Sequence, residues 1–314
     1  MNIFLVGLKL CRELPHRKYR IGSGFKPALS GAVIKVGNYV KPRLADLPVF
    51  SNIFSLAYRA RLSLHRQNLP PLSEVEGLIL NDLEIKGIHQ SDSTVLAIPG
   101  TAAMIAKARL LLTQYQSGQA VNNSRLTVPQ GVASQDPDIS LWGLNESLLN
   151  IVENYIGLPI YYLGAEIKRE FADGQAGGVR KWHIDPEDRR MVKIIVYLSH
   201  VDEQSGPFEY MTKDLTRRAV SRTHYASGLI SDEKMIKVMR QADCQVCLGD
   251  EGTIALFDGC SIFHRAQLPL KQDRASITFH YVSKYPIILR TPDSLQRLPW
   301  MEEKLTDRQR RCLM

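Results

Sequence analysis

The chain has 314 residues, 44% of them hydrophobic and 23% charged, which is the balance of a globular protein with a sizeable core. Disordered, collagen-like and coiled-coil chains are excluded. No run of about eighteen apolar residues is present, and the apolar residues 1–11 lack a signal-peptide cleavage pattern. Five scattered cysteines do not form a disulfide framework. We therefore expect no membrane span and a cytoplasmic location.

The formal net charge of +8 is unevenly placed along the chain. Residues 1–66 carry twelve Lys and Arg against two acidic residues, a net of +10, so the remaining 248 residues are at −2. Such a segment can attract nucleic acid, anionic lipid or an acidic carrier protein, although scattered cations are more often a solvated surface. No nucleic-acid-binding signature accompanies it, so we expect no nucleic-acid partner.

The first half of the chain is predicted to be mostly helical. The periodic segments that predict helices are Val49–Arg66, Leu72–Ile88, Thr101–Gln116 and Leu141–Tyr155. Between them, Thr94–Ile98 predicts a short strand and Ser117–Pro137 a polar loop. Residues 1–48 show no clear period, which favours an irregular extension.

Strand chemistry begins after Pro159. The runs rich in Ile, Val, Tyr and Phe are Ile160–Phe171, Met191–Ser199, Thr253–Phe257 and Ser276–Val282. Ser231–Gln241 predicts one helix inside an insertion, and Pro292–Met314 predicts a charged surface helix. Helices followed by strands favour an α+β protein in which a β-sandwich or barrel is buttressed by helices.

The segment Trp182-His183-Ile184-Asp185 carries the first chemical signal. In an extended strand, residues two apart point to one face, so His183 and Asp185 can hold one ion. His264, after the strand Thr253–Phe257 and a turn, can supply a third ligand. Two histidines and one carboxylate leave three coordination positions open, which favours Fe(II) over structural zinc. Alternatively, both histidines belong to the core.

Arg274 follows ten residues after His264, with Ser276 at the head of a strand. A guanidinium binds a carboxylate through two hydrogen bonds, and a nearby hydroxyl adds a third. A metal face beside a carboxylate receptor indicates a chelating keto-acid cosubstrate. The alternative for Arg274 is a surface ion pair.

The pattern His183-Ile184-Asp185 … His264 … Arg274-Ala275-Ser276 resembles HxD…H…RxS of the Fe(II)/2-oxoglutarate-dependent dioxygenases. Residues 182–185, followed by Val196–Asp202 and Gly206-Pro207, resemble the phytanoyl-CoA dioxygenase-like branch, as do residues 80–88. The resemblance covers about residues 72–285. Phe208–Lys213 replaces a Pro-Gly-Ser-His-like segment that is frequent in that branch.

The resemblance implies a double-stranded β-helix core of the jelly-roll, cupin-like type, buttressed by helices. It divides the chain into a basic N-terminal extension (1–71), a dioxygenase domain (72–290) with a lid-like insertion (212–245), and a charged tail (291–314). His183, Asp185 and His264 would bind Fe(II) and serve catalysis. Arg274 and Ser276 would bind 2-oxoglutarate, which together with O2 completes the set of cofactor and cosubstrates.

Lys193 and Tyr197 share a strand face and are further candidates for contact with the cosubstrate, although core packing or solvent exposure is the more common role for such residues. Basic residues of the insertion, such as Arg217 and Arg218, favour an anionic or carrier-tethered small-molecule substrate. The function expected is hydroxylation of an unactivated C–H bond with release of succinate and CO2. The alternatives are a catalytically inactive jelly-roll binding protein, or an oxygenase acting on a macromolecule docked by the basic N-terminal segment.

Overall fold

The computed structural model describes residues 48–116, 121–122, 125–173, 180–240, 243–288 and 298–313. These residues all belong to one compact unit that spans Lys41–Met314. Most of the basic N-terminal segment, residues 1–47, and residues 291–297 of the tail lie outside the described residues. The expected extension over 1–71 is therefore described only from residue 48 onward.

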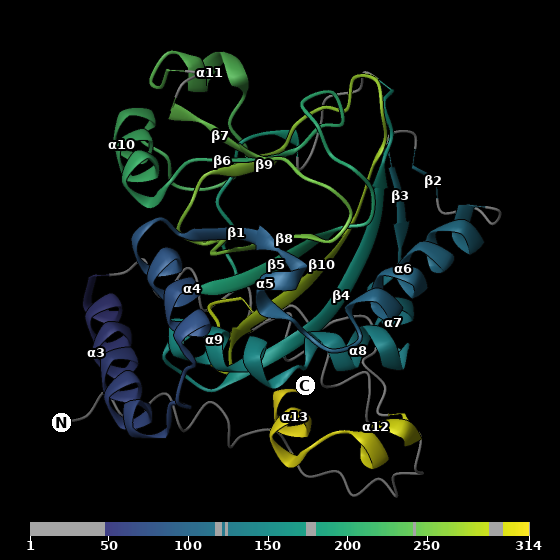
Figure 1. Ribbon diagram of the computed structural model, residues 1–314. Helices are drawn as coiled ribbons and strands as arrows, with labels where there is room; N and C mark the ends of the chain where they lie inside the picture. The colour runs from purple at the N-terminus through teal and green to yellow at the C-terminus, as the bar shows by residue number, and fades with distance from the viewer. Residues whose placement is uncertain are drawn as a thin grey trace, which may run out of the picture. The chain divides into compact units, whose positions relative to one another are not determined.

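Two antiparallel sheets organise the described chain (Figure 1). The large sheet has the strand order β1-β8-β5-β10-β4-β3-β2, and the small sheet has the order β7-β6-β9. The strands of the large sheet are β1 (Ile88–Asp92), β2 (Val121–Asn122), β3 (Arg125–Val128), β4 (Ile160–Glu170), β5 (Met191–Tyr197), β8 (Thr253–Phe257) and β10 (Arg274–Ser283). Those of the small sheet are β6 (Phe208–Tyr210), β7 (Gln245–Cys247) and β9 (His264–Ala266). The chain is thus α+β with antiparallel sheets.

The helices lie mainly against the large sheet, on the face opposite the small sheet (Figure 1). Their bounds are α3 (Pro48–His65), a 3-10 turn (Arg66–Asn68), α4 (Glu74–Ile85), α5 (Ser93–Leu96), α6 (Thr101–Gln116), α7 (Gln130–Ala133), α8 (Pro137–Gly143), α9 (Glu146–Ile156), α10 (Lys213–Thr223), α11 (Asp232–Ile236), α12 (Pro299–Lys304) and α13 (Asp307–Cys312). Local signals set their ends: Ser73 and Glu76 form a capping box at the start of α4, and Gly157 ends α9 with φ of +74°.

The two faces of the large sheet differ in chemistry. Towards the helices, β4 and β10 present buried apolar side chains such as Ile167, Ile277 and Phe279. Towards the small sheet, the same strands place Glu166 opposite Thr278 and Lys168 opposite Ser276. A second apolar cluster that includes Phe208 and Phe257 fills only part of the space between the sheets. The polar part of that space holds the candidate site.

Two expectations for the first half of the chain were wrong. Thr94–Ile98 is not a strand: Asp92 accepts a hydrogen bond from Thr94 N at 2.8 Å and caps the short helix α5, while the strand β1 lies just before it. The polar segment Ser117–Pro137 is not only a loop, because its described part contains β2, β3 and α7. Pairing of β3 with β4 in the folded protein stabilises a strand in this segment in spite of its polar composition.

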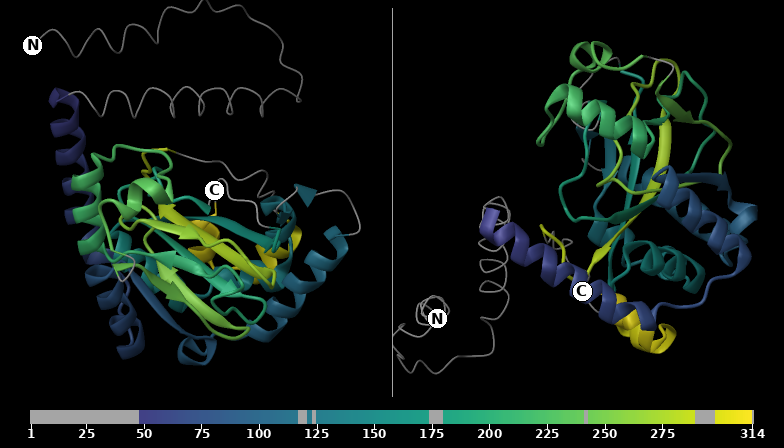
Figure 2. Two further views of the ribbon diagram at one scale, coloured as in Figure 1. Left: turned by 90° about the horizontal axis from the view of Figure 1, so that it is seen from above. Right: turned by 90° about the vertical axis from the view of Figure 1, so that its left-hand side faces the viewer.

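The C-terminal tail forms two short helices rather than one charged surface helix. Met301, Leu305, Cys312 and Leu313 are buried, and they belong to the main core cluster. Figures 1 and 2 show α12 and α13 at the opposite end of this unit from α10 and α11.

The four cysteines within the described residues are all free. Among the described helices, none has the length and apolar character needed to span a bilayer.

Candidate metal centre

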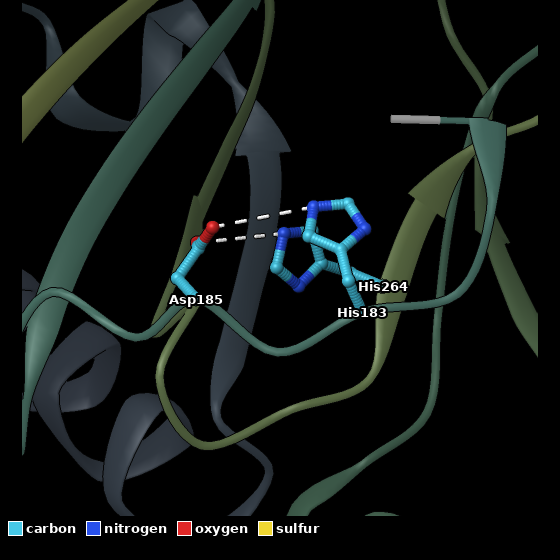
Figure 3. Close-up of side chains that lie close together, drawn as sticks. All are labelled: His183, Asp185 and His264. Carbon is cyan, nitrogen blue, oxygen red and sulfur yellow. Dashed lines mark ion pairs between the residues drawn. The ribbon is translucent and has the colours of Figure 1, made fainter. Parts of the chain in front are cut away.

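His183, Asp185 and His264 come together between the two sheets. One ligand atom from each lies within 4.8 Å of the others. His264 Nε2 is 3.5 Å from Asp185 Oδ2, and His183 Nε2 is 4.0 Å from Asp185 Oδ1. Both rings turn their Nε2 atoms towards the carboxylate (Figure 3). Two imidazoles and one carboxylate that approach an ion from one side form the facial triad of ligands that suits Fe(II).

Backbone pairing holds the two histidines side by side. His183 N donates to His264 O, and His264 N donates to His183 O, both at 3.1 Å. This pair is an isolated bridge, so the expectation of a regular strand through Asp185 was wrong. Asp185 instead lies in a loop, where its N–H donates to Gly259 O at 2.8 Å. The turn after β8 therefore places the carboxylate.

Each histidine is oriented by a carbonyl two residues earlier in the chain. His183 Nδ1 lies 2.8 Å from Lys181 O, and His264 Nδ1 lies 3.1 Å from Ile262 O. A carbonyl only accepts, so each Nδ1 donates its N–H to that carbonyl, and each Nε2 is the ring nitrogen that can bind a metal ion. Burial lowers the pKa of His264 to about 3, although Asp185 opposes that shift. Both features prepare Nε2 for a metal ion.

Asp185 is a buried carboxylate with a cation beside it. Lys193 Nζ lies 2.6 Å from Asp185 Oδ2. Burial alone would raise the pKa of Asp185, but Lys193 and His264 outweigh it and hold that pKa well below its usual range. The carboxylate is therefore charged near neutral pH, as a metal ligand must be.

Arg274 lies in a pocket that also contains His183, His264, Ser276, Lys193 and Tyr197; we call it the Arg274 pocket. Arg274 is only 7% exposed and forms no ion pair with any described residue. Its neighbour across the sheet, Glu170, is paired with Arg180 at 3.2 Å. Arg274 donates to Gly206 O, and its Nε is buried without a hydrogen-bond partner.

The remaining predicted site residues also line the Arg274 pocket. The Tyr197 hydroxyl donates to Cys247 O at 2.8 Å and accepts from Phe208 N at 3.2 Å, so backbone groups already engage it. Glu166 and Lys168, which were not predicted from the sequence, pair at 2.6 Å and line the same pocket. The sequence feature that could have identified Glu166 and Lys168 is their alternation with the apolar residues Ala165 and Ile167 along β4.

A second pocket adjoins the Arg274 pocket and is lined by Asp185; we call it the Asp185 pocket. It shares His183, Lys193, Lys168, Glu166 and His280 with the Arg274 pocket, and adds, among others, Asp185, Glu187, Arg125, Gln130, Ser227 and Leu229. The insertion borders this pocket through residues 227–229. Arg217 and Arg218 line a separate surface hollow on α10 and neither lines the Asp185 pocket, so the expected anionic substrate stays a prediction.

No family model and no curated protein matches the chain. Solved structures are similar to it. HygX from Streptomyces hygroscopicus with nickel and 2-oxoglutarate bound shares 18% identity at a TM-score of 0.46, over 68% of this chain and 88% of that chain. EctD from S. alaskensis in its apoform shares 17% at 0.48, over 70% and 81%. The epimerase SnoN in complex with Fe3+, alpha ketoglutarate and nogalamycin RO shares 14% at 0.48, over 71% and 90%. Because these TM-scores are below 0.5, the function of the chain has to be inferred from its own residues.

Proposed function

We propose that the chain is a non-haem Fe(II)/2-oxoglutarate-dependent oxygenase of the phytanoyl-CoA dioxygenase-like family, with a double-stranded β-helix core. Its reaction is the hydroxylation of an unactivated C–H bond in a small molecule, with release of succinate and CO2. The sequence pattern that runs from His183 to Ser276 supports the family, and the two facing antiparallel sheets support the core.

One observation carries this proposal: a buried arginine without an ion pair in the described chain shares a pocket with His183 and His264, two of the three potential metal ligands. Burying a guanidinium without a counter-charge is costly. The cost is recovered when a carboxylate binds, because the guanidinium then forms a bidentate ion pair. A dicarboxylate that chelates a metal through one end would place its other carboxylate at Arg274.

The residues of the site have separate roles. His183, Asp185 and His264 would hold Fe(II) through two Nε2 atoms and one carboxylate oxygen. Arg274 and Ser276 would bind and orient 2-oxoglutarate. Iron and 2-oxoglutarate together supply the activation of O2 that C–H oxidation requires. The substrate would approach through the Asp185 pocket, since that pocket is lined by His183 and Asp185 but not by Arg274.

The test is an anaerobic titration with Fe(II) and then 2-oxoglutarate, which gives a weak visible charge-transfer band when the keto acid chelates the iron. We expect the band in the wild-type protein and its loss in His183→Ala and Asp185→Ala. Arg274→Met should retain iron but require about tenfold more 2-oxoglutarate, because it removes a charge-assisted ion pair of about 1.5–3 kcal/mol.

The matched control is His200→Ala, because His200 is an exposed histidine outside both pockets. It should give the wild-type band. A wild-type protein that binds Fe(II) and 2-oxoglutarate without forming the band contradicts the proposal, and would favour a jelly-roll binding protein without oxygenase activity.

A further inference from the structure

Lys193 lines the pocket and also contacts one of the proposed metal ligands, Asp185. It projects from β5, and its ammonium is 2.6 Å from Asp185 Oδ2. The two side chains are 16% and 8% exposed, so both charges are largely removed from water. Asp185 is the one carboxylate with which Lys193 forms an ion pair in the described chain.

Burial makes this pair important in the metal-free protein. A buried carboxylate without a partner is strongly destabilising. Lys193 supplies the missing positive charge. Across the sheet its neighbours are His280 and Phe257, and Glu187 is a second carboxylate that lines the Asp185 pocket with it.

A divalent ion at the triad makes the presence of Lys193 electrostatically less favourable, because two cations then share the carboxylate of Asp185. The ammonium already contacts Oδ2, and like charges at such short range repel. Lys193 therefore stabilises the metal-free site more than the loaded site. By linkage, a group that favours the free state weakens ligand binding by the same free energy.

We propose that Lys193 is a built-in placeholder cation: it neutralises Asp185 before the metal arrives and opposes metal binding afterwards. This inference rests on the proposed function, because it requires the triad to bind a divalent ion. Lys193 is a positioning residue in this role. By retaining Oδ2, it also leaves the ion a single carboxylate oxygen, and so preserves open coordination positions for the cosubstrate.

The experiment compares Lys193→Met and Lys193→Gln with the wild-type protein. Two quantities are measured: the Tm of the metal-free protein, and the Kd for Co(II) by calorimetry under anaerobic conditions. We expect the two to move in opposite directions, with a lower metal-free Tm and a Kd that is about tenfold smaller. Either variant suffices if the other does not fold, and Lys193→Arg, which keeps the charge, should bind Co(II) as the wild type does.

Lys168→Met is the matched control. Lys168 lines both pockets and forms an ion pair of the same 2.6 Å length, but with Glu166 and not with the triad. It should lower the Tm and leave the Kd for Co(II) unchanged.

The inference is overturned if the Lys193 variants bind Co(II) as weakly as the wild type or more weakly, or if Lys168→Met tightens binding equally. A wild-type protein that binds no Co(II) overturns the proposed function itself, which separates the two failures.

Discussion

At the scale of single residues, one glycine in the turn after β8 limits where Asp185 can lie in the candidate metal centre. A Cβ on Gly259 would overlap Asp185 Oδ2, far inside van der Waals contact. The carbonyl of the same residue accepts the Asp185 N–H. We therefore expect Gly259→Ala to displace the carboxylate and to weaken Co(II) binding about tenfold or more, a loss of about 1.4 kcal/mol or more.

Calorimetric titration with Co(II) measures this effect, and Gly77→Ala is its control. Gly77 lies inside α4 and has no heavy atom within 4 Å of an added Cβ, so its replacement should leave the Kd unchanged. Wild-type affinity in a folded Gly259→Ala protein would show that Asp185 tolerates the displacement.

The ligand residues of the candidate centre show how much of it could be predicted from the sequence. The grouping of His183, Asp185 and His264 could be predicted from the sequence, because their residue types and order follow a metal-ligand pattern, and the structure brings the three together. The contact between Lys193 and Asp185 could not be predicted from the sequence. It depends on where an irregular loop places Asp185 above β5, and no local pattern encodes that placement.

At the scale of elements, the errors arise where tertiary structure competes with propensity. Long periodic segments such as Thr101–Gln116 agree with the structure, since their pattern is redundant over many residues. Short segments do not have that redundancy. Thr94 and Val95 favour a strand, yet one hydrogen bond from Thr94 N to the Asp92 side chain is enough to begin α5.

The helix α12 gives a test of the C-terminal segment as part of the core. Met301 is buried in the main cluster, whereas Glu303 on the same helix is exposed. We expect Met301→Ala to lower the free energy of unfolding by about 2–5 kcal/mol, because it leaves a cavity. Glu303→Ala should change it by less than about 0.5 kcal/mol. Urea denaturation followed by circular dichroism measures both, and equal values would place α12 outside the core.

At the scale of the whole molecule, the two sheets separate stability from chemistry. The helix-facing side of the large sheet holds the main apolar core, and part of the space between the sheets holds charged and polar side chains. Buried charges of this kind cost stability unless ligands neutralise them. Metal and cosubstrate are thus expected to contribute to the stability of the whole fold as well as to its chemistry.

This coupling predicts stepwise thermal stabilisation. A ligand at a hundredfold excess over its Kd adds about 2.7 kcal/mol, which raises Tm by several degrees. Co(II) under anaerobic conditions should raise the Tm of the wild-type protein, 2-oxoglutarate should raise it further, and a chelator should reverse both steps. Asp185→Ala should lose both steps, because the cosubstrate chelates the metal. Arg274→Met should keep the first and lose most of the second, since only the cosubstrate's far carboxylate depends on the guanidinium. Equal losses in the two variants, measured by differential scanning calorimetry, would show that Arg274 acts on the metal and not on the keto acid.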